Sequence, residues 1–101
     1  MELVVESNNI VLRPMADIVS SRVKEMVDNA KEFLETHNKV NEVILDLHHV
    51  KIIDSIGITF VVGLYKSTAV KGKTFKITGM NTDIRQLFKI MRLDEIFVIE
   101  D

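Results

Sequence analysis

Hydrophobic and polar residues follow two different periods along the chain, and the changes of period predict its elements. Short runs rich in Val, Ile, Leu and Phe predict strands, whereas apolar residues spaced three and four positions apart predict helices. The predicted strands span residues 3–6, 10–13, 42–47, 74–78 and 96–99, and the predicted helices span residues 21–37, 54–71 and 82–92. The order β-β-α-β-α-β-α-β predicts an α/β fold, a mixed β-sheet with parallel βαβ crossovers and covering helices.

The predicted strand 42–47 is a compact apolar run, which is typical of a strand buried on both faces. We therefore expect this strand in the centre of the sheet, with four residues largely buried: Val43, Ile44, Leu45 and Leu47. The first two strands predict an antiparallel hairpin at one side of the sheet.

Apolar residues on the second predicted helix form two arcs when successive residues are placed 100° apart around the helix axis. The arc expected to face the core holds Ile58, Val61, Val62, Tyr65 and Ala69. The other arc holds Ile56, Phe60 and Leu64 and begins beside Ser55. If this second arc faces solvent, it is a hydrophobic surface of the kind that binds a partner. The alternative is that another helix or a loop covers it.

The composition predicts one globular domain over residues 1–101. Hydrophobic residues make up 47% and charged residues 28% of the chain, and no repeat or linker interrupts it. The absence of cysteine excludes disulfides, thiolate metal sites and cysteine nucleophiles. The three histidines have no acidic or histidine partner at metal-ligand spacing, so we expect no metal and no cofactor.

Charge and hydropathy also restrict the partners. The net charge is −2 and basic residues are scattered among acidic ones, so we expect no nucleic acid partner. The N-terminus has no basic region followed by a long apolar run, which argues against a secretory signal. No apolar stretch is long enough to cross a bilayer, so we expect a cytoplasmic protein with no membrane partner.

Two catalytic motifs are incomplete in this chain. Gly72-Lys73-Thr74 resembles the end of a phosphate-binding loop, but Ser67 occupies the position of the required glycine. A nucleophile elbow at Ser55 needs a glycine where the chain has Ile53. We therefore expect that the chain is not an enzyme, and that Ser55 is a substrate rather than a nucleophile.

Helix caps are predicted at three places. Ser20 or Ser21 is expected to cap the first helix, and Asn81 is one of two candidates for the third. Asp54 is expected to cap the second helix, with Ser55 in its first turn and its hydroxyl toward solvent. This arrangement alone indicates a well-capped helix. A phosphoryl group on Ser55 would also meet the positive end of the helix dipole.

Residues 46–58 carry the pattern D-L-x-x-V-x-x-I-D-S-x-G-I, which resembles the STAS domain family and especially bacterial anti-sigma factor antagonists. The similarity extends over residues 42–99 and agrees with the predicted order of elements. The resemblance implies that an anti-sigma factor serine kinase phosphorylates Ser55 and that a PP2C-type phosphatase reverses this. It also implies that the unphosphorylated form binds the kinase and thereby releases a sigma factor.

The expected partner-binding residues are Asp54, Ser55, Ile56, Gly57, Phe60, Leu64 and Asp17. Asp17 is included as the counterpart of an acid that follows the second strand in such antagonists. The chain departs from the family pattern at Ile56, where relatives often carry a small hydroxyl residue. The alternative is an unphosphorylated STAS scaffold, or an accessory subunit of a transporter or sensory complex.

Overall fold

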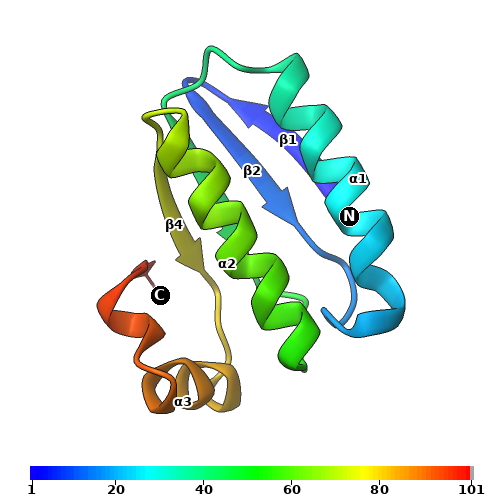
Figure 1. Cartoon of the computed structure of the whole chain (residues 1–101), viewed down its shortest axis with the longest axis vertical. Coiled ribbons are helices and arrows are strands. Elements are labelled where there is room, and N and C mark those ends of the chain that lie inside the picture. Colours follow the sequence, from blue (N-terminus) through cyan, green and yellow to red (C-terminus); the bar gives the residue numbers. More distant parts are fainter. Residues whose placement is uncertain (101) are drawn as a thin grey trace.

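The computed structural model describes residues 1–100, which form one mixed sheet and its helices (Figure 1). The strands are β1 (Glu2–Glu6), β2 (Asn9–Arg13), β3 (Glu42–Asp46), β4 (Thr74–Thr78) and β5 (Val98–Glu100). The helices are α1 (Ser20–Thr36), α2 (Ser55–Val70), α3 (Thr82–Ile90) and the 3₁₀ helix η1 (Leu93–Glu95). The strand order is β1-β2-β3-β4-β5, in which only the β1–β2 pair is antiparallel. The predicted α/β fold and hairpin are confirmed.

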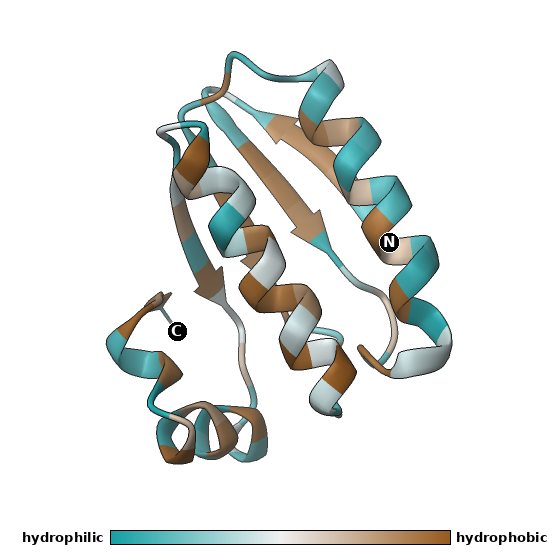
Figure 2. Ribbon diagram, viewed as in Figure 1, coloured by the Kyte–Doolittle hydropathy of each residue, from teal (hydrophilic) through white to brown (hydrophobic). Residues whose placement is uncertain are grey.

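Helices α1 and α2 lie side by side on one face of the sheet and run in the same direction, whereas α3 follows the carboxyl end of β4 (Figure 1). The two helices differ in amphipathicity. In the same view, α1 presents mainly hydrophilic residues outward, while α2 presents apolar and weakly polar residues there as well (Figure 2). The outer side of α2 is therefore unusually apolar for a surface helix.

Strand β3 lies between β2 and β4, as expected for a central strand. Its side chains alternate, however, because the helices α1 and α2 cover only one face of the sheet. Val43 and Leu45 are fully buried under the helices, whereas Ile44 on the other face is only half-buried. The expectation that both faces of this strand are buried is thus wrong at Ile44.

The C-terminal segment begins its strand later than predicted. Residues 93–95 form η1, so Ile96 and Phe97 precede β5 rather than starting it. Ile96 is exposed, but Phe97 is buried and packs against the rings of Tyr65 and Phe75 at centroid distances of 5.3 and 5.8 Å. These aromatic contacts take Phe97 into the core without a strand.

Candidate functional site

The carboxylate of Asp54 joins the N-termini of two helices. Its Oδ1 accepts a hydrogen bond from the Gly57 amide at 2.7 Å, which caps α2 as predicted. Its Oδ2 accepts another from the amide of Ser20, the first residue of α1, at 2.8 Å. These hydrogen bonds from Gly57 and Ser20 hold the pKa of Asp54 below the ordinary value of an aspartate.

This second bond corrects the predicted cap of α1. The N-cap position is Val19, whose side chain cannot accept a hydrogen bond, and Ser20 lies inside the helix. A residue distant in sequence therefore supplies the acceptor that Ser20 or Ser21 was expected to supply. At α3 the prediction is confirmed, because the Asn81 side chain accepts from the Ile84 amide at 2.8 Å.

Main-chain hydrogen bonds tie the segment before α1 to the loop before α2. The Ile18 amide donates to the Ile52 carbonyl at 3.1 Å, and the Asp54 amide donates to the Ile18 carbonyl at 3.2 Å. The Asp17 carboxylate accepts from the amides of Lys51 and Ile52 at 2.9 and 3.1 Å. Asp17 thus holds the loop in place, and its Oδ1 is already engaged by two amides.

Gly57 is required by this close approach of the two segments. A Cβ atom on Gly57 would lie 2.1 Å from the Ile18 carbonyl oxygen and 2.8 Å from the Ile53 side chain. The residue is buried, so it shapes the site from below and offers no side chain to a partner. The glycine of the D-S-x-G pattern is explained by this contact.

Ser55 is the first residue of α2 and is exposed to solvent. Within residues 1–100, its hydroxyl has no hydrogen-bond partner, so the fold does not depend on it. Two exposed apolar side chains lie within three residues of Ser55 in the chain: Ile52 and Ile56, which are 59 and 48% exposed. We call Ser55, Ile52 and Ile56 the Ser55 patch.

Sequence reasoning identified Ser55 and Ile56 but missed Ile52. A signal for Ile52 was available, because Ile52 and Ile53 are adjacent in a short loop and cannot both point into the core. The structure buries Ile53 and leaves Ile52 outside.

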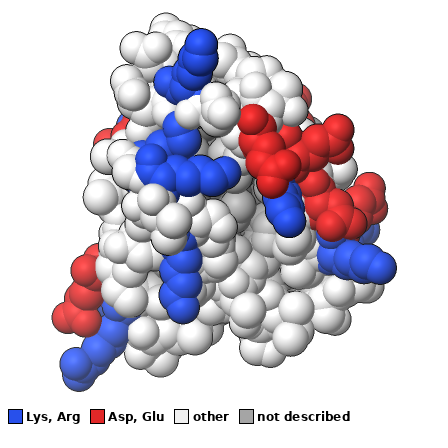
Figure 3. Space-filling model, turned by 45° about the horizontal axis from the view of Figure 1, so that its top comes forward, with Lys and Arg blue, Asp and Glu red and all other residues white. Residues whose placement is uncertain are grey.

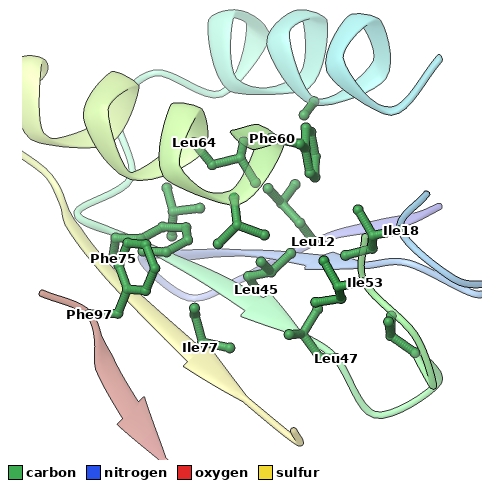
Figure 4. Close-up of a cluster of buried hydrophobic side chains, with 14 of the residues drawn as sticks. Leu12, Ile18, Leu45, Leu47, Ile53, Phe60, Leu64, Phe75, Ile77 and Phe97 are labelled. Carbon is green, nitrogen blue, oxygen red and sulfur yellow. The ribbon is translucent and has the colours of Figure 1, made fainter. Parts of the chain in front are cut away.

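The expectation that Phe60 and Leu64 face solvent is wrong. They are only 5 and 6% exposed, and both point into the space between the helices and the sheet (Figure 4). Helix α1 covers this arc of α2, which is the alternative weighed above. On the arc expected in the core, Ile58 and Val61 are buried, but Ala69 is exposed.

The described residues contain few features of other kinds of site. No group of three or more His, Asp or Glu side chains in residues 1–100 could hold a metal ion. Among the helices of that part of the chain, none is long and apolar enough to span a membrane. An exposed hydroxyl on a helix N-terminus with apolar neighbours is suited to protein binding.

The STAS domain family matches residues 1–101, and the chain belongs to this family. A solved structure of a candidate anti-sigma factor antagonist from Thermotoga maritima is similar, with a TM-score of 0.89 and 20% identity over 99% of this chain and 85% of that one. The anti-sigma factor antagonist SpoIIAA in its unphosphorylated form has a TM-score of 0.73 and 14% identity over 99 and 86% of the two chains.

A third similar structure comes from another kind of protein. A sulfate transporter family protein from Wolinella succinogenes has a TM-score of 0.79 and 14% identity, over 95% of this chain and 80% of that chain. At these identities the three structures establish the shared fold.

Proposed function

We propose that this chain is a phosphorylation-switched binding module, an anti-sigma factor antagonist that binds an anti-sigma factor serine kinase when Ser55 is unphosphorylated. The observation that carries the proposal is the position of Ser55, which is exposed, has no hydrogen-bond partner within residues 1–100, and has the exposed apolar residues Ile52 and Ile56 within three positions of it in the chain. A kinase can reach such a hydroxyl, and a partner can cover its apolar neighbours. Binding of the kinase would free a sigma factor.

A phosphoryl group on Ser55 would leave the fold intact. The hydroxyl makes no hydrogen bond within residues 1–100, and the helix N-terminus carries a partial positive charge that favours an anion. The neighbouring Asp54 carboxylate remains bonded to the amides of Gly57 and Ser20, which offsets part of its repulsion for the phosphate.

The same modification would disrupt the complex. Phosphorylation adds about −1.5 to −2 charges, and these must lose water if Ile52 and Ile56 are covered by an apolar partner surface. Burial of an unpaired charge is strongly unfavourable. A PP2C-type phosphatase would restore binding by removing the charge, and the exchange of partners would take place in the cytoplasm.

The test uses the full chain, ATP and an anti-sigma factor kinase encoded in the same genome. We expect intact-mass spectrometry to show one added phosphate, and none on the Ser55→Ala variant. Ser55→Asp should bind the kinase roughly tenfold or more weakly, with an unchanged circular dichroism spectrum. Ala69→Asp adds the same charge to an exposed position near the other end of α2 and should bind like wild type.

Phosphate transfer to another residue, or unchanged binding after phosphorylation, would contradict the proposal. Absence of both phosphate transfer and kinase binding would instead favour an unphosphorylated scaffold or accessory subunit, an alternative that the likeness to the sulfate transporter family protein supports.

A further inference from the structure

A groove of about 640 Å³ runs between α1 and α2 on the outer side of the molecule. Its walls are mostly apolar and include Val23 and Val27 from α1 and Ile56 and Val70 from α2. Val27 and Val70 are 41 and 88% exposed. Figure 3 shows this face with a hollow between the two helices. An apolar groove that continues onto exposed valines is typical of a surface that another molecule covers.

Gly63 lies in this groove and has no structural reason to be glycine. A Cβ atom on Gly63 would meet nothing within 4 Å, and its φ angle is not positive. Glycine in a helix interior destabilises the helix relative to alanine. The small side chains of Thr59 and Ser67 lie one turn before and after Gly63 and also line the groove. Together these residues leave a shallow depression on the outer side of α2.

The shape of α1 complements this depression. The bond between the Ser20 amide and Asp54 places the starts of α1 and α2 at the same level, and the helices run in the same direction (Figure 1). Because each residue rises 1.5 Å along a helix, Val27 stands within about one residue of the level of Gly63. The exposed Val27 side chain projects from α1, and the depression at Gly63 lies on α2 at about the same level. Both features belong to one chain, but they lie on different helices.

The charges of the two helices are complementary as well. Helix α2 contains no acidic residue, and Lys66 and Lys71 border the groove on its side. Helix α1 contributes Glu35 and the basic Lys31 to the border, and Glu32 follows Lys31 in the chain. Because the two helices start at the same level, Lys66 stands near the level of Glu32 and Lys71 near that of Glu35. Within residues 1–100, none of the side chains of Glu32, Glu35, Lys66 and Lys71 forms an ion pair.

Figure 3 shows the result on the whole face. Acidic side chains gather over α1, together with some basic ones, whereas only basic side chains border the hollow on the α2 side. A partner that places an acidic surface over α2 and a basic surface over α1 would be complementary in charge to both helices.

We propose that the occupant of the groove is a second copy of this chain. A twofold axis parallel to the helices would place α1 of each copy over α2 of the other, with Val27 over Gly63. The same rotation would bring Glu32 and Glu35 to Lys66 and Lys71. Such an interface is self-complementary and closed, so it makes a dimer and not a fibre.

The surface area that the two helices could bury indicates how tightly this dimer associates. Two helices of this length cover about 24 Å by 20 Å, so the interface would bury roughly 1,000 Å² in total. This area is at the low end for specific complexes. We therefore expect a dissociation constant in the micromolar range rather than an obligate dimer.

Sedimentation velocity of the full chain from about 5 to 500 µM would show the dimer as a concentration-dependent rise in sedimentation coefficient. Gly63→Lys fills the depression at a position where a side chain fits, and should weaken association roughly tenfold or more. Ala69→Lys adds the same side chain to an exposed position of α2 outside the groove, and should leave association unchanged. Circular dichroism checks that both variants are folded.

A charge exchange tests the pairing directly. The double variant Lys66→Glu, Lys71→Glu should associate more weakly than wild type, and so should Glu32→Lys, Glu35→Lys. The two double variants mixed in equal amounts should form a heterodimer in which both pairings of opposite charges are favourable, and the fourfold variant restores both pairings in its own dimer. We expect the fourfold variant to associate within about threefold of wild type.

Three results would overturn the proposal. A monomer at every concentration would leave the groove to a partner helix or an apolar ligand. Equal association of the Gly63→Lys and Ala69→Lys variants would place the dimer contact elsewhere on the surface. A fourfold variant that associates no better than either double variant would exclude the proposed charge pairing.

Discussion

The inner and outer sides of helix α2 contain two glycines with opposite surroundings. Gly57 faces inward, where a Cβ atom would lie 2.1 Å from a carbonyl oxygen, and Gly63 faces outward, where a Cβ atom would meet nothing within 4 Å. Both lie in one helix, six residues apart. The difference shows that glycine serves close packing at one end of α2 and an open surface in the middle.

The surroundings of the two glycines also differ in how they are supported: hydrogen bonds to other segments fix the N-terminal end of α2, and within residues 1–100 no such bonds shape its outer side near Gly63. At the N-terminal end of α2, hydrogen bonds through Asp54 and Ile18 join α1, α2 and the loop between β3 and α2. Ser55 therefore projects from a rigid support, as a recognised side chain should. The outer side of α2 owes its shape mainly to the small residues Thr59, Gly63 and Ser67, which leave a shallow depression.

The largest expected change in the free energy of unfolding comes from comparing a buried and an exposed residue on the apolar arc of α2 that holds Ile56, Phe60 and Leu64. Phe60→Ala should lower the free energy of unfolding by about 3–5 kcal/mol, because the ring is buried between the helices and the sheet. Ile56→Ala, on the same arc but 48% exposed, should lower it by about 1 kcal/mol or less. Urea denaturation measures both, and equal losses would contradict the assigned burial.

Alanine substitutions of Gly57 and Gly63 should change the free energy of unfolding in opposite directions. Gly57→Ala should lower the free energy of unfolding by about 2–3 kcal/mol, since the new methyl group collides with the Ile18 backbone. Gly63→Ala should raise it by about 0.5–1 kcal/mol through helix propensity alone. Thermal and urea unfolding of the pair would decide the matter, and a destabilised Gly63→Ala would show that its outer side is packed.

The smallest expected effect concerns pH. The pKa of Asp54 is lowered in the folded state by the amides of Gly57 and Ser20. Its contribution to stability is therefore complete above the unfolded-state pKa of about 3.9, and is lost as the pH falls from there through the folded-state pKa. Urea denaturation at pH 7 and pH 3 should show a smaller acid loss for Asp54→Asn than for wild type.

Asp94→Asn removes an exposed carboxylate on η1 and provides the control, because its acid loss should match that of wild type. If Asp54→Asn lost as much stability in acid as wild type, the two helix caps would not depend on the charge of Asp54.

Much of the site could be predicted because its chemistry is local. A carboxylate before a helical pattern caps that helix wherever it occurs, so Asp54 and the exposed position of Ser55 follow from short-range rules. The cap of α1 could not be predicted this way, because Asp54 lies 34 residues after Ser20. Only the folded chain brings that carboxylate to the Ser20 amide.

Burial on α2 shows the same limit. A helical wheel states which residues share a side, but it does not state which neighbour lies against that side. Phe60 and Leu64 share an arc with Ile56, and α1 covers the first two while leaving the third exposed.

The sequence by itself determined the order of strands and helices, the mixed sheet, the capped start of α2 and the place of Ser55 within it. Periodicity and capping depend on residues a few positions apart, so they can be read along the chain. The tertiary structure alone decided that Ile44 is half-buried, that Ile52 is exposed while Ile53 is buried, and that Gly57 is enclosed while Gly63 is open. These features depend on contacts between segments that are distant in sequence, and such contacts exist only after α1 and α2 have packed on the sheet.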